Sequence, residues 1–121
     1  RAEEAIPHME EAIHLSPADP GIGPFYARLS AAYFYLGQYD QAVEKGRIGI
    51  RKTVPWPGYA YVTAALGHLG RAEEARHARE ELEKARPEIT LNFIRSHIPS
   101  VPKEYLDSLL DGLDKAGLAE Q

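Results

Sequence analysis

Apolar residues recur along this chain every three or four positions, which is the spacing of amphipathic helices that bury one face. Two stretches, one at each end, show the pattern most clearly. Near the start the apolar positions are Ala5, Ile6, Met9, Ala12 and Ile13, and near the end they are Leu106, Leu109, Leu110 and Leu113. Further apolar segments of helical length lie between them, so the pattern predicts a chain of helices.

The chain also resembles itself. Segments 1–17 and 71–87 align without a gap, sharing RAEEA at the start and a proline at the end. A more degenerate third copy occupies 38–55, and each of the two later copies follows a Leu-Gly pair. Self-similarity at a spacing of 33 to 37 residues between copies indicates a repeat architecture.

Each unit is predicted to be a helix, a glycine turn, a second helix and a link marked by proline. Gly37 and Gly70 stand where a chain leaving a helix often needs a positive φ, which glycine adopts without steric cost. Pro17, Pro55 and Pro87 close the units, because proline is tolerated at a helix start but not in its interior.

The residues of these units resemble the tetratricopeptide repeat (TPR) family. One copy matches at Tyr26, Leu29, Tyr33, Gly37, Tyr39 and Ala42, and the next matches at Tyr59, Val62, Leu66, Gly70, Ala75 and Pro87. Ser30 and Thr63 depart from the small residues that the family favours. Gly46 and Gly49 also depart from it, and we attribute them to close helix packing, at a cost of roughly 1 kcal/mol each in helix propensity.

The resemblance implies an all-α fold, a TPR-like α-solenoid of antiparallel helix pairs with a C-terminal capping helix. It divides the chain into the second half of a truncated repeat at 1–17, full repeats at 22–55 and 56–87, and a helical cap at 88–121. Within the cap we expect a short helix from Glu88 to about Arg95, opened by Pro87, and a longer one from Pro102 to about Ala116, capped by Gly117. The ending GLDKAGLAE resembles segments that close TPR regions in bacterial multidomain regulators.

Composition and charge narrow the range of functions. The chain has 121 residues, 44% of them hydrophobic and 26% charged, and a net charge of −4. No apolar stretch approaches the roughly 20 residues of a spanning helix, and an acidic chain lacks the basic surface that nucleic acid requires. We therefore expect a cytoplasmic protein that binds neither membrane nor nucleic acid. The chain starts inside a predicted helix, so we also expect a fragment of a larger protein.

Few residues are candidates for catalysis or metal binding. The five histidines provide no pair at i, i+4 on a predicted helix, and cysteine is absent, so we expect no metal site. Adjacent glutamates, as at 73–74 and 80–81, point about 100° apart on a helix and do not converge on one bond. We expect no catalytic residue, no cofactor and no enzymatic activity.

The first helices of such units line the concave groove of a solenoid. The positions predicted to face this groove are Ala27, Ala31, Phe34, Tyr35, Ala60, Tyr61, Ala64 and His68. They would form a floor of small residues with aromatic edges, suited to a helical or extended segment of another protein or of another domain of the parent chain. An equally weighted alternative is that these aromatic residues contact the C-terminal tail or neighbouring helices.

A second surface is the face of the first helix, with Ile6, Met9 and Ile13, which would be left open in a truncated repeat. Pro7 lies near enough to the first turn of this helix to be tolerated. The main hypothesis is a protein-interaction or scaffold module of a larger bacterial regulatory protein, and the alternative is a homodimer formed through this edge. Trp56 is placed in a link, where packing over the preceding helix end is favoured over a role as an interaction anchor.

Overall fold

A computed structural model describes residues 2–52, 56–98 and 101–121, and over this part of the chain it contains seven helices and no strand. The helices are α1 (Ala2–Leu15), α2 (Ile22–Tyr35), α3 (Tyr39–Lys52), α4 (Trp56–Leu69), α5 (Ala72–Ala85), α6 (Leu91–His97) and α7 (Lys103–Lys115). The predicted all-α class is confirmed. Pro55, expected to close the middle unit, lies outside the described residues.

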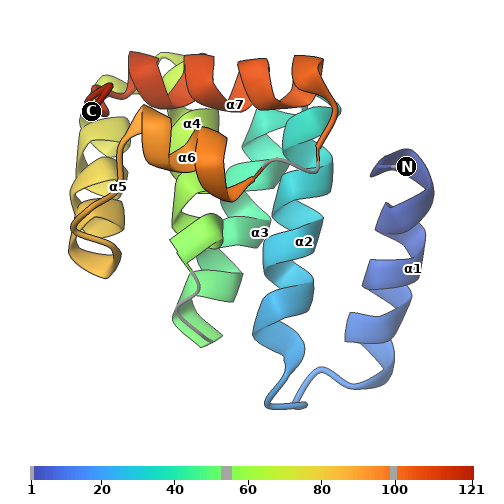
Figure 1. Cartoon of the computed structure of the whole chain (residues 1–121). Helices are drawn as coiled ribbons and strands as arrows, with labels where there is room; N and C mark the ends of the chain where they lie inside the picture. Colours follow the sequence, from blue (N-terminus) through green and yellow to red (C-terminus); the bar gives the residue numbers. More distant parts are fainter. Residues whose placement is uncertain (1, 53–55, 99–100) are drawn as a thin grey trace.

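The helices form two neighbouring hairpins with additional helices around them (Figure 1). α2 packs against α3 and α4 packs against α5, while α2 and α4 also contact each other. α1 stands at one edge beside α2, and α7 lies across the C-terminal ends of α2 and α4. We call the side on which α7 lies the α2–α4 face.

Glycine turns end α2 and α4 as the sequence predicted. Gly37 has φ 78° and Gly70 has φ 72°, both in the left-handed region. The Gln38 amide donates to the Tyr33 carbonyl at 2.9 Å and the Gly37 amide to the Phe34 carbonyl at 2.9 Å, so carbonyls at the helix end gain partners. Gly117, with φ 96°, ends α7 in the same way.

The two glycines inside α3 mark close helix contacts, which confirms the sequence interpretation. A Cβ atom at Gly46 would collide with the Val62 side chain and lie 2.9 Å from Ser30 Oγ. A Cβ at Gly49 would lie 3.0 Å from Tyr26 Cβ. Ser30 is fully buried, and its hydroxyl donates to the Ala42 carbonyl at 2.6 Å, so this polar residue is satisfied where the family favours a smaller one.

The hydrophobic core extends from the hairpins into the C-terminal segment. Leu66 and Leu82 of the second hairpin are fully buried, and so are Ile94 of α6 and Leu109 and Leu113 of α7. α7 therefore contributes to the same core as the repeated units.

Helices α4 and α7 approach each other closely enough for their backbones to touch. A Cβ atom at Gly112 would lie 2.5 Å from the Ala64 carbonyl oxygen and 2.9 Å from Ala64 Cα. A Cβ at Gly67 would likewise collide with the Gly112 carbonyl oxygen. The two backbones therefore touch at a point where each helix presents only hydrogen.

Two expectations about local structure are wrong. The short helix α6 begins at Leu91 rather than at Glu88, because the Thr90 hydroxyl accepts from the Phe93 amide at 3.0 Å and forms the N-cap. Trp56 is the first residue of α4 rather than part of a link, and its ring meets Phe93 of α6 edge-on, with centroids 5.4 Å apart. The tryptophan thus packs on the C-terminal segment.

The contact between α4 and α7 can be tested with two glycine substitutions. Gly112→Ala should lower the free energy of unfolding by about 1–3 kcal/mol, because the new methyl meets backbone atoms that have no room to move. Gly58→Ala in α4 is the matched control, since a Cβ there meets only Ala27 Cβ at an ordinary 3.8 Å. It should stabilise the protein by up to about 1 kcal/mol through helix propensity. Urea unfolding curves that show the two variants equally stable would contradict the close contact.

Candidate functional site

The structure places the predicted groove residues on the α2–α4 face, but much of this face is covered. Phe34, Ala60, Tyr61 and Ala64 are buried, whereas Ala27, Ala31, Tyr35 and His68 are partly exposed. The buried four cannot reach a partner while the C-terminal segment is in place.

The tail contacts the aromatic positions directly. The Tyr35 ring stacks on Tyr105 of α7, with centroids 4.7 Å apart and an interplanar angle of 16°. His68 Nε2 lies 2.8 Å from the Ser108 carbonyl oxygen, which can only accept, so this nitrogen carries the proton. The sequence analysis left open the alternative that the aromatic residues contact the tail. Tyr35 and His68 follow this alternative.

Under α7 the hydroxyls of Tyr35 and Tyr61 lie 2.5 Å apart and share a hydrogen bond. Burial raises the pKa of Tyr35 well above its ordinary value, and the neighbouring Tyr61 adds to the shift. Burial also raises the pKa of Tyr61, and the bond from Tyr35 offsets only part of this effect. The pair is therefore neutral and structural at ordinary pH.

One part of the α2–α4 face remains uncovered. It forms a cleft of about 660 Å³ between α1, α2 and the start of α7, which we call the α1–α2 cleft. Its lining residues are Glu3, Ala5, Met9, Arg28, Ala31, Ala32, Tyr35, Leu36, Val101, Pro102 and Tyr105. Ala31 and Tyr35 come from the predicted groove and Met9 from the predicted open edge. The structure thus brings together parts of two surfaces that the sequence analysis treated as separate.

The cleft is open because α1 packs loosely. Its apolar stripe faces α2, yet all five stripe residues, including the predicted edge residues Ile6, Met9 and Ile13, are only half-buried. Pro7 is the sixth residue of α1, just beyond its first turn, so its missing amide leaves the Glu3 carbonyl without the usual partner. A side-chain bond from the Tyr33 hydroxyl to Glu10, 3.0 Å long, ties α1 to α2.

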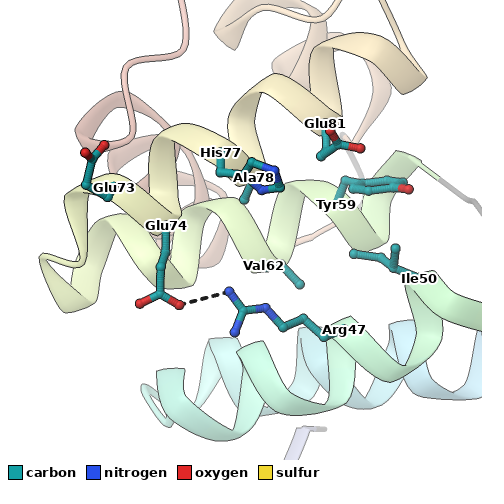
Figure 2. Close-up of a pocket in the computed structure, with 9 residues that line it drawn as sticks. All are labelled: Arg47, Ile50, Tyr59, Val62, Glu73, Glu74, His77, Ala78 and Glu81. Carbon is teal, nitrogen blue, oxygen red and sulfur yellow. Dashed lines mark hydrogen bonds and ion pairs between the residues drawn. The ribbon is translucent and has the colours of Figure 1, made fainter.

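A second cleft, of about 490 Å³, lies between α3 and α5 over α4 (Figure 2). Its floor is apolar, with Ile50, Val62 and Ala78 among the lining residues. Across it Arg47 donates to Glu74 at 3.1 Å. Hydrogen bonds from Arg71 and Arg47 lower the pKa of Glu74, and it stays ionised. The Arg47–Glu74 pair therefore joins α3 and α5 across the cleft.

Among the described residues, no three histidine or acidic side chains converge as metal ligands would. His68 Nδ1 lies 3.9 Å from Asp111, which is the one acidic residue that pairs with this ring within the described ranges.

No helix in the described part of the chain has the length and apolar character needed to cross a bilayer.

Comparisons with known proteins provide one similarity. No protein-family model matches the chain, and no solved structure matches it. The chain is similar to the mouse protein-lysine N-methyltransferase SMYD4, with 32% identity over 97 residues. This alignment covers 74% of the present chain but only 12% of the methyltransferase.

The Tyr35→Ala variant tests whether the Tyr35 ring holds α7 in place or only lines a groove that is free for a partner. We expect Tyr35→Ala to lower the free energy of unfolding by about 1–3 kcal/mol, because the half-buried ring and its stacking on Tyr105 are lost. Tyr35→Phe keeps the ring and should cost only about 1 kcal/mol for the lost hydrogen bond. Chemical denaturation would reveal the difference, and wild-type stability of Tyr35→Ala would show that the ring does not hold α7.

The tyrosine pair also predicts the response to alkaline pH. In the unfolded chain tyrosine ionises near pH 10, whereas the buried pair keeps its protons to higher pH. The folded state then binds more protons than the unfolded state, so stability falls as the pH rises above about 10. Each group contributes up to about 1.4 kcal/mol per pH unit there. Unfolding measured from pH 8 to 11 should show a shallower decline for the Tyr35→Phe/Tyr61→Phe double variant. Parallel curves for the two proteins would refute the assignment.

Proposed function

We propose that this chain is a TPR-like protein-interaction module that binds a helical segment of another protein in the α1–α2 cleft. The observation that carries the proposal is the position of the cleft, because it continues the face on which α7 already lies. A helix of this protein thus occupies one part of the face, and an apolar part of similar lining stays open beside it.

The way in which α7 packs on the hairpins indicates how a second helix would bind. α7 inserts Leu109 and Leu113 between neighbouring helices and brings Gly112 against the backbone of α4. The open cleft has similar kinds of residues. Small residues such as Ala31 and Ala32 form its floor, and Tyr35 and Tyr105 form one wall. An incoming helix with one apolar stripe would bury these surfaces, which is the usual driving force for helix-in-groove recognition.

We assign no chemical step to the module. Its role is that of a scaffold, and the TPR resemblance favours a place within a larger bacterial regulatory protein in the cytoplasm, whose partner or own further domain supplies the helix. The similarity to the mouse methyltransferase covers too small a part of that enzyme to support a catalytic role here.

A second candidate is homo-oligomerisation through α1. It is favoured by the half-buried Ile6, Met9 and Ile13 and by Leu15 at the end of the same helix, which is 70% exposed. In this case Met9→Glu would disperse the dimer in sedimentation equilibrium, and a dimer that survived this charge would exclude the α1 edge.

Filling the cleft tests the main proposal. The probe is a fluorescent helical peptide of about four turns, with a leucine stripe and otherwise glutamine and alanine. We expect wild-type protein to bind it and Ala31→Phe to weaken binding at least about tenfold, because the added ring occupies the floor. Ala85→Phe, at an exposed position on α5, is the matched control and should bind like wild type. Fluorescence anisotropy measures both, and equal binding by the two variants would locate the interaction elsewhere.

A further inference from the structure

The two sides of the α1–α2 cleft differ in charge. α1 carries Glu3, Glu4, Glu10 and Glu11 and no lysine or arginine between Ala2 and Leu15. Glu3 lines the cleft, and Glu10 lies seven residues further on the same face, where Tyr33 of α2 donates to it. The side of the cleft formed by α1 is therefore acidic along about two helical turns.

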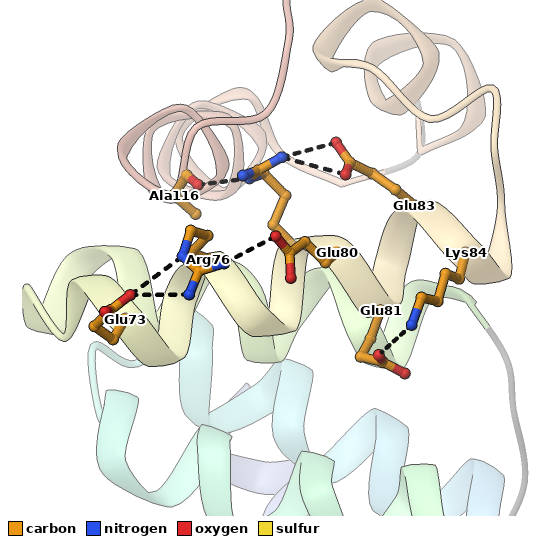
Figure 3. A network of polar contacts seen from close by, with 8 residues as sticks. Glu73, Arg76, Glu80, Glu81, Glu83, Lys84 and Ala116 are labelled. Carbon is orange, nitrogen blue, oxygen red and sulfur yellow. Dashed lines mark hydrogen bonds and ion pairs between the residues drawn. The ribbon is translucent and has the colours of Figure 1, made fainter.

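These charges are not offset within the described part of the chain, where none of the four glutamates belongs to an ion pair. Helix α5 has a comparable number of glutamates and shows the opposite arrangement (Figure 3). Arg76 bridges Glu73 and Glu80, and Lys84 pairs with Glu81. The glutamates of α5 are thus paired with nearby cations, whereas those of α1 are exposed and one of them, Glu3, lines the cleft.

The opposite side of the cleft carries a single charge, that of Arg28 in its lining. Arg28 is the only charged residue of α2, and its guanidinium lies over the Phe25 ring, 5.7 Å from the centroid. At the start of α7 the lining residues Val101, Pro102 and Tyr105 are uncharged, and Lys103 is paired with Asp107 at 2.9 Å. The cleft therefore has an apolar floor, an acidic border along α1 and one cation, Arg28, on the side of α2.

We infer that the partner of the α1–α2 cleft is a basic amphipathic helix, with an apolar stripe on the cleft floor and lysine or arginine residues along the side that faces α1. This inference rests on the proposed function and specifies the chemistry of the occupant. Apolar burial provides most of the affinity, and the complementary charges fix the orientation of the bound helix and raise its rate of association. The net charge of −4 acts in the same direction at longer range.

Three peptides with the same leucine stripe and flanking positions of lysine, glutamine or glutamate test this inference. Wild-type protein should bind the lysine peptide most tightly and the glutamate peptide least, and the difference should shrink as salt screens the charges. Glu3→Lys should weaken the lysine peptide about two- to fivefold and strengthen the glutamate peptide, while Glu3→Gln should lie between it and wild type.

Asp114→Lys is the matched control, because it makes the same change of charge at an exposed site on α7 away from α1. It should alter the affinities less than Glu3→Lys does, and circular dichroism verifies that all variants keep their helix content. Equal binding of the three peptides, or equal effects of Glu3→Lys and Asp114→Lys, would overturn the inference on charge and leave helix binding intact. If none of the peptides binds, the proposed function fails as well. A dimer that excludes the lysine peptide and dissociates in Met9→Glu would identify a second copy as the occupant and overturn the inference.

Discussion

The approach of α4 and α7 at Gly67 and Gly112 determines which surface of this molecule is free. At this point the backbone of one helix touches that of the other, because neither residue carries a side chain. Packing at such short distance gains dispersion contacts along both helices, and it leaves no space for even one methyl group. The position of α7 follows from this contact, and so does the placement of Tyr105 on Tyr35 and of Ser108 beside His68.

Contacts at the end of α7 hold it in the same position. Arg79 of α5 donates through Nε to the Ala116 carbonyl at 3.0 Å, and Leu118 is buried just beyond the helix. The carbonyls of Ala119 and Glu120 then accept from the first amides of α6, at 2.9 and 3.1 Å. Since these bonds satisfy the open N-terminal amides of a helix, the C-terminal segment is part of the core. On the α2–α4 face, the surface that α7 leaves uncovered is therefore the one next to α1.

Local features of this fold could be read from the sequence, and the contacts between distant segments could not. The sequence was sufficient to identify Gly37, Gly70 and the glycines of α3, because a glycine at such a position itself indicates a turn or a tight helix contact. Gly67 and Gly112 are 45 residues apart and lie on different helices, and nothing in either segment indicates that they meet. The predicted groove residues lie on the expected helices, but their burial depends on where the tail packs. The cleft combines residues of α1, α2 and α7, so only the arrangement of the three helices reveals it.

We conclude that α7 belongs to the core and that the α1–α2 cleft is the opening that it leaves on the α2–α4 face. Native-state hydrogen exchange tests it most directly, because it measures the free energy at which each helix opens. We expect the slowest amides of α4 and α7 to open with the same free energy, that of global unfolding, and those of α1 to open with a lower free energy. If α7 exchanged through a low-energy opening while α4 stayed protected, the whole α2–α4 face would be accessible and α7 would not belong to the core.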